Sequence, residues 1–196
     1  MTTADSNPAR LIDTYAHTFD TTETRMVLVD AHPATVLGGV ERLELARTVV
    51  HAIEAVGLAD RLALAPTRLD AGGGHEHVYG MAWRVDGVAA ESVDPQHLRA
   101  FDRPGYVKLI WDVRVEAGGE TGTLLSTTTR LVSTDHVSRE RLRAAWGVFG
   151  PVSTALSRRA LAAVKRYAEE QDELPSFGSV DRSGRRPQAS RFALAA

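Results

Sequence analysis

The sequence contains no cysteine, and this absence removes several classes of chemistry at once. Disulfide bonds, thiolate metal sites and cysteine nucleophiles are excluded, although histidine and carboxylate chemistry stays open. No apolar run approaches the roughly 20 residues of a membrane-spanning helix, so we expect no membrane insertion. The first ten residues, MTTADSNPAR, lack the basic start and apolar segment of a secretory signal. Their composition predicts a cytoplasmic protein.

The chain also lacks a large excess of positive or negative charge. The formal net charge of −2 argues against a nucleic-acid partner, because such partners usually require a basic surface. Lysine occurs only at Lys108 and Lys165, and this preference for arginine is typical of GC-rich coding and indicates a bacterial source. The length of 196 residues, with 43% hydrophobic and 24% charged residues, predicts one globular domain.

The first half of the chain predicts a strand followed by helices. Residues 25–29, RMVLV, are typical of a short strand. Apolar residues recur at helical spacing over residues 34–57, and Gly38-Gly39 divides this stretch into two short helices. Residues 61–67 predict a weak strand, and residues 70–74, DAGGG, predict a loop that joins two strands.

Strong alternation then predicts antiparallel strands. One face carries the bulky residues that we expect to point inward, namely His77, Tyr79, Met81, Trp83 and Val85 in the first segment and Val107, Leu109, Trp111, Val113 and Val115 in the second. The second segment predicts a half-buried strand, and Gly118-Gly119 turns it into a Thr-rich strand over residues 123–133. Asp112 and Arg130 lie on the outward side, where we expect a cross-hairpin ion pair worth at most about 1 kcal/mol.

The last predicted element is a long helix from Ser138 to about Gln171. Its apolar stripe, which we expect to cover the sheet, comprises Leu142, Trp146, Phe149, Val152, Leu156, Ala160 and Tyr167. Gly150-Pro151 predicts a kink or a split, because proline removes a backbone donor. Residues 173–196 predict a mobile tail, residues 1–23 an N-terminal extension, and residues 24–172 the folded domain. The final ALAA is explained by chance in an Ala-rich sequence.

Four segments resemble an uncharacterised bacterial branch of the START, polyketide-cyclase and birch-allergen (SRPBCC) superfamily. They are VYGMAWRVDG, PGYVKLIWDVRVE, LLSTTTRLVSTD and RLRAAWGVFGPVSTALSRRALAAVKRYAE, and the resemblance covers about residues 25–170. It implies an α+β helix-grip fold, in which a curved antiparallel sheet wraps around a long C-terminal helix, with two short helices after the first strand. Relatives carry glutamate where this chain has Thr128, so a strand carboxylate is missing here.

The resemblance also implies an elongated cavity between sheet and helix as the ligand site. The candidate lining residues are Tyr79, Met81, Trp83, Leu109, Trp111, Leu125, Thr127, Thr129, Trp146, Phe149 and Leu156. Each of them alone is more simply explained as core, but their convergence in this fold favours a cavity wall.

Other chemistry finds little support in the sequence. No GxSxG elbow is present, and the AGGGH segment lacks the lysine and hydroxyl residue of a phosphate loop. His75 and His77 share one strand face without a carboxylate to complete a metal site, so we expect two solvated histidines. His32 precedes Pro33 at a helix start, where we expect a capping or surface role.

Three functions stay open. The first is a binding module for a hydrophobic or aromatic small molecule, lipid-like or polyketide-like, with no cofactor implied. The second is a polyketide cyclase or dehydratase that uses the same cavity, with Tyr79, Thr127 and Thr129 as its polar groups. The third is a structural or interaction protein whose interior is filled by side chains and whose surface forms a homodimer. The superfamily includes lipid carriers, hormone receptors and aromatase/cyclases, so the fold alone does not choose among them.

Overall fold

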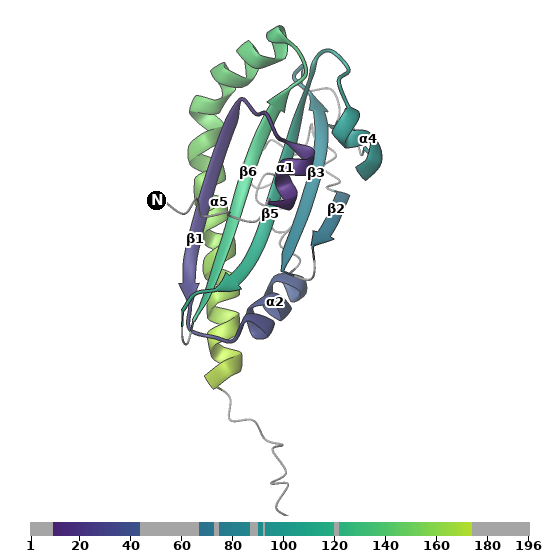
Figure 1. The fold of residues 1–196 in the computed structure, drawn as a ribbon. Helices are drawn as coiled ribbons and strands as arrows, with labels where there is room; N and C mark the ends of the chain where they lie inside the picture. Colours follow the sequence, from purple (N-terminus) through teal and green to yellow (C-terminus); the bar gives the residue numbers. More distant parts are fainter. Residues whose placement is uncertain are drawn as a thin grey trace, which may run out of the picture.

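A six-stranded antiparallel sheet forms the centre of the molecule (Figure 1). The computed structural model describes residues 10–43, 67–72, 75–86, 90–91, 93–119 and 122–173. The strands are β1 (Thr21–Val29), β2 (Thr67–Gly72), β3 (Glu76–Arg84), β4 (Ala90–Glu91), β5 (Tyr106–Ala117) and β6 (Thr123–Ser133). Their order is β1-β6-β5-β3-β2, with β4 paired to β3.

Helices cover both faces of this sheet. They are α1 (Leu11–Tyr15), α2 (Pro33–Arg42), α4 (Pro95–Ala100) and α5 (His136–Glu173). Figure 1 shows α5 running along one face and α1 lying against the opposite face. A curved antiparallel sheet with a long C-terminal helix confirms the predicted α+β helix-grip architecture.

The face toward α5 is packed at its two ends. At one end, Leu142 of α5 packs with Val107 and Leu131, and Trp83, Leu109 and Trp146 lie against this group. At the other end, α5 and α2 pack on the sheet through a larger cluster, which contains Val29, Val36, Val40, Val113, Val115, Leu125, Ala160, Leu161, Val164 and Ala168. These two clusters hold α5 to the sheet by burying apolar surface.

The opposite face is not open to solvent, because α1 and α4 close it. Ile12 of α1 and Leu98 of α4 are fully buried against Val78, Ala82 and Ile110 of the sheet, in a third apolar cluster. The alternation predicts a half-buried β5, whereas most residues of β5 are buried on both faces. The pattern separates the two faces correctly, but the second layer comes from helices too short to produce a periodic signal.

The predicted ion pair between Asp112 and Arg130 is wrong. Asp112 lies opposite Thr128, and Arg130 lies opposite Ile110. Asp112 is 0% exposed and pairs with Arg10, whereas Arg130 donates to the Asp13 carboxylate at 2.6 Å and to the Ala16 carbonyl at 2.7 Å. Both side chains therefore hold the N-terminal segment on the sheet instead of facing water.

Several boundaries also differ from the sequence-based expectations. β1 begins at Thr21 instead of Arg25, and β2 continues to Gly72 through residues expected to form a loop. α2 begins at Pro33, and His32 caps it by accepting from the Ala34 amide at 3.2 Å, as expected. The predicted second short helix and most of the weak strand at residues 61–67 lie outside the described residues. The predicted tail, apart from Glu173, lies outside them as well.

Pro151 lies inside α5 without splitting it. The helix is continuous from His136 to Glu173, so the alternative of two separate helices is wrong. Figure 1 shows that the first part of α5 runs in a different direction from the rest. A proline inside a helix is one of the usual causes of such a bend. None of the described helices has both the length and the apolar character that crossing a bilayer requires.

Candidate functional site

The middle of the α5-facing side of the sheet holds several of the predicted lining residues. Two adjacent rows cross the strands there, one through Thr129, Trp111 and Tyr79 and the next through Thr127, Val113 and His77. We call these two rows the central rows. The first row lies between the two apolar clusters that attach α5 to the sheet, and Val113 of the second row belongs to the larger cluster.

The other predicted lining residues lie nearer the ends. Trp83, Leu109 and Trp146 pack against one cluster, and Leu125 belongs to the other. Met81 is buried opposite Leu109. Leu156 is half-buried on α5, and the side chain of Phe149 lies outside the described part of the chain. The structure therefore separates the predicted set into packed ends and a more polar centre.

Trp111 and Tyr79 form an aromatic platform in the central rows. Their rings stack with centroids 5.5 Å apart and planes 19° apart. Trp111 is only 4% exposed, and among the described residues its indole Nε1 finds no hydrogen-bond acceptor. A buried tryptophan N–H usually has an acceptor, so this donor is an exception that calls for an explanation.

His77 supplies a second buried donor next to this platform. It is 2% exposed, which makes the expectation of a solvated histidine wrong. Arg68 Nη2 lies 2.6 Å from His77 Nδ1, and because arginine only donates, Nδ1 is the acceptor. The proton of the neutral ring is therefore on Nε2, which has no hydrogen-bond partner within the described structure and lies 4.0 Å from Glu41 Oε1.

Burial sets the protonation of both residues. It lowers the pKa of His77, and the Arg68 guanidinium lowers it further, while the Glu41 carboxylate opposes both effects. Burial likewise raises the pKa of Tyr79, against the influence of Arg68. At neutral pH the imidazole is uncharged and the phenol keeps its proton, so both side chains act as neutral hydrogen-bonding groups.

A polar cluster ties β1 to α5 beside the central rows. Thr154 of α5 donates to Glu23 Oε1 at 2.7 Å, and Arg25 Nη2 lies 3.0 Å from the same oxygen. Arg25 also donates to Thr154 Oγ1 at 3.3 Å. These contacts satisfy the Glu23 carboxylate and fix this edge of the site.

Two buried N–H groups without an acceptor among the described residues thus belong to neighbouring rows of one face. Trp111 is paired with Tyr79, and His77 is paired with Val113. Trp111 and His77 are therefore diagonal neighbours, whose Cα atoms usually lie roughly 7–8 Å apart. Such a pair favours a ligand with hydrogen-bond acceptors over a metal ion. In the part of the chain that the structure describes, no three His, Asp or Glu side chains gather as a metal site.

The sequence signal for His77 was present but easy to misjudge. His77 shares the alternation of Tyr79, which places it on the inner face, yet a histidine near a strand end is usually solvated. The Arg68 and Glu41 contacts depend on the pairing of β2 with β3 and on the position of α2. Neither contact has a signature in the local sequence.

Comparisons with known proteins find likeness in structure alone. The chain matches no family model and no curated protein. A crystal structure of the Zhui aromatase/cyclase from Streptomyces sp. R1128 is similar at 18% identity and a TM-score of 0.33, covering 77% of this chain and 94% of that one. A hypothetical protein of Helicobacter pylori is similar at 12% identity and a TM-score of 0.39, covering 86% and 99%. A protein of Thermus thermophilus is similar at 12% identity and a TM-score of 0.29, covering 77% and 96%.

Proposed function

We propose that this chain is a member of the START, polyketide-cyclase and birch-allergen superfamily and binds an aromatic or hydrophobic small molecule between the sheet and α5. The single observation that carries the proposal is the buried indole N–H of Trp111, which has no acceptor among the described residues. Membership in the superfamily rests on the order of the elements and on the four segments that resemble it.

The physical argument is the cost of an unsatisfied buried donor. Leaving such a group without a partner costs roughly 1–3 kcal/mol. A ligand whose acceptor atom approaches Trp111 Nε1 removes this cost, and its ring gains a flat surface in the stacked Trp111 and Tyr79 pair. A bound molecule therefore explains this donor better than an interior filled by side chains does.

The same donors define the chemistry of the ligand. Trp111 Nε1 and His77 Nε2 both donate, and neither accepts in the neutral tautomer that Arg68 imposes. The ligand therefore carries acceptors, and a carbonyl oxygen on a ring system fits two N–H groups on one face. Polyketide-like aromatic ketones belong to this class, whereas a plain hydrocarbon chain does not use either donor.

Two matched probes test this proposal. 1-Tetralone and tetralin share one fused ring skeleton, but only the ketone accepts a hydrogen bond. In a proton–nitrogen correlation spectrum of the full chain, we expect 1-tetralone to shift the Trp111 indole signal in a saturable way. We expect the ketone to bind about 2–10 times more tightly than tetralin, the factor that one net hydrogen bond provides.

Phenylalanine substitutions supply the controls. Trp111→Phe keeps an aromatic ring but removes the donor, so the preference for the ketone should disappear. Trp146→Phe makes the same change in the packed end cluster and should leave the preference intact. Equal binding of both probes to the unaltered protein would contradict the proposed ligand class. If neither probe binds, the third function, a structural protein with an interior filled by side chains, is favoured.

A cyclase or dehydratase remains the second candidate. If both N–H groups reached one carbonyl, they would stabilise the negative charge that its oxygen gains when an enol carbon attacks it in an aldol cyclisation, with solvent water taking the enol proton and protonating the new alkoxide. The paired donors at Trp111 and His77 favour this reading over other enzyme classes. Turnover of a linear poly-β-ketone that is lost in His77→Phe would establish the enzyme. Binding without turnover would support only the binding function.

A further inference from the structure

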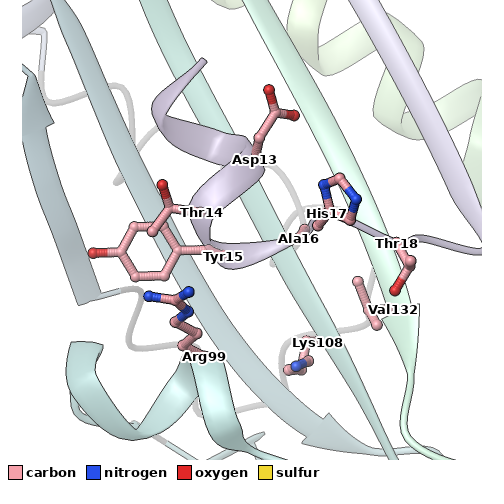
Figure 2. Close-up of a pocket in the computed structure, with 9 residues that line it drawn as sticks. All are labelled: Asp13, Thr14, Tyr15, Ala16, His17, Thr18, Arg99, Lys108 and Val132. Atoms are coloured by element: carbon pink, nitrogen blue, oxygen red, sulfur yellow. The ribbon is translucent and has the colours of Figure 1, made fainter. Parts of the chain in front are cut away.

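A separate pocket lies on the opposite face of the sheet, away from α5. It has a volume of about 520 Å³ and is formed by α1, the segment that follows it, α4 and the sheet (Figure 2). Its wall includes Tyr15, Ala16 and Val132, which are largely apolar, and Thr14 and Thr18, which carry hydroxyls. The volume is typical of small-molecule sites.

Lys108 of β5 lines this pocket and is nearly buried. Its side chain is 8% exposed, and its Nζ makes one hydrogen bond, to the Leu98 carbonyl at 3.5 Å. An ammonium group has three donors, so the other two have no protein acceptor in the described structure. Lysine is almost never buried without a partner, which makes this position informative.

No carboxylate neutralises Lys108 at close range within the described residues. Asp13 also lines the pocket, but its carboxylate is held by Arg130 at 2.6 Å. Burial lowers the pKa of Lys108, and the Asp102 carboxylate opposes this shift. Arg99 and His17, both exposed, add basic groups to the wall. The pocket therefore has more cationic than free anionic groups.

We propose that this pocket binds a small organic monocarboxylate, with the carboxylate on Lys108 and the apolar part of the molecule against Ala16, Tyr15 and Val132. Figure 2 places Lys108 between Arg99 on one side and Val132 on the other, so one ligand can contact both charge and apolar surface. The proposal is independent of the α5-facing site, because the sheet separates the two.

A monoanion matches this pocket better than a phosphate dianion. Lys108 contributes one buried positive charge, and a carboxylate brings one negative charge. A second negative charge on the ligand would have only the exposed groups Arg99 and His17 as neighbours, and solvent weakens the attraction between exposed charges. The carboxylate also supplies acceptors for the two ammonium donors that have no partner among the described residues.

The small number of lysines makes a direct test feasible. Lys108 and Lys165 are the only lysines, so carbon-13 labelling of lysine gives two side-chain ε-CH₂ signals in the full-length protein. Benzoate is titrated at constant ionic strength, with benzamide as a neutral probe of the same shape. We expect benzoate to shift the Lys108 signal in a saturable way and benzamide to leave it unchanged. Lys165, which is paired with Glu169 on α5, is the internal control.

Two variants complete the design. Lys108→Met has similar length and no charge, so we expect it to fold and to bind benzoate at least 10-fold more weakly. Lys165→Met removes the other lysine and should bind benzoate as the unaltered protein does. Circular dichroism checks the folding of both. The proposal is overturned if both lysine signals shift together, if benzamide shifts Lys108 equally, or if folded Lys108→Met retains benzoate affinity.

Discussion

Arg10 and Asp112 join the N-terminal segment to the middle of the sheet, with Arg10 Nη2 2.8 Å from Asp112 Oδ2. The same guanidinium nitrogen donates to Thr128 Oγ1 at 2.6 Å, and Asp112 Oδ1 accepts from the Thr128 amide at 2.7 Å. Glu76 adds a second attachment by accepting from the Leu11 and Ile12 amides at the start of α1. This network explains why a helix as short as α1 stays on the sheet.

Removing Arg10 should destabilise the fold because it leaves the buried Asp112 carboxylate without its positively charged partner. We expect Arg10→Met to decrease the free energy of unfolding at pH 7. Because Arg10 is partly exposed, the decrease should be near the low end of the roughly 3–5 kcal/mol that breaking a buried ion pair costs. Urea denaturation measures this change. Adding Asp112→Asn to Arg10→Met should recover part of the loss, and Arg141→Met on the exposed side of α5 is the control. A loss that the second substitution does not reduce would contradict this explanation.

The pH dependence of Asp112 has a definite sign. Burial raises its pKa from 3.8 to about 6, although Arg10 and the Thr128 amide oppose the shift. The folded protein therefore binds more protons than the unfolded chain between these two values, so this group lowers the free energy of unfolding as the pH rises from about 4 to about 6. We expect Asp112→Asn to lack this decrease. Parallel slopes for both proteins over this window would show that Asp112 does not titrate there.

Asp135 should have the opposite pH dependence. Hydrogen bonds from the Gly105 amide and the Ser138 amide lower its pKa to about 2, so its contribution to stability is present above its ordinary pKa of 3.8 and is lost as the pH falls toward 2. Because Asn keeps an acceptor without the charge, the melting temperature of Asp135→Asn should depend less on pH in this range. Asp102→Asn, at an exposed position, is the matched control; an equal change there would argue against a specific effect.

Gly80 and Gly38 should respond to alanine in opposite directions. A Cβ at Gly80 would lie 2.4 Å from Leu98 Cδ2 and 2.7 Å from Leu69 Cδ1, inside the cluster that holds α4. We expect Gly80→Ala to cost roughly 1–3 kcal/mol from overpacking. Gly38 lies within α2 with nothing within 4 Å of the added carbon, so Gly38→Ala should stabilise by about 0.5–1 kcal/mol. Thermal and urea unfolding would settle both signs.

Removing residues 174–196 should leave stability unchanged, because the last buried side chain of α5 is that of Ala168. A shorter form that ends at Glu170 should be less stable. It lacks Asp172, whose carboxylate accepts from the His32 amide at 2.7 Å and from Thr35 Oγ1 at 2.8 Å at the start of α2. Melting temperatures of the two truncated forms test this difference, and a large loss on removal of residues 174–196 alone would contradict it.

Alternation and helical spacing predicted the long strands, the C-terminal helix and which residues lie on the same face. Val107, Trp111 and Val113 lie on the α5 side as the pattern requires, and the stripe of Leu142, Trp146 and Ala160 faces them. These features are local, because strand and helix geometry fixes side-chain direction residue by residue. The same alternation predicted part of the candidate site, because it places Tyr79 and Trp111 on one inner face, where their rings stack.

The sequence by itself therefore determined which residues share a face, but only the tertiary structure decided what covers that face. Asp112, Arg130 and Lys108 have the alternation of solvated residues, yet α1 and α4 bury all three. The partner of Asp112 is Arg10, 102 positions away, and no short-range pattern encodes a contact over that separation. Polar residues on a strand are stable either in water or beneath a layer that satisfies them, and the choice depends on long-range packing.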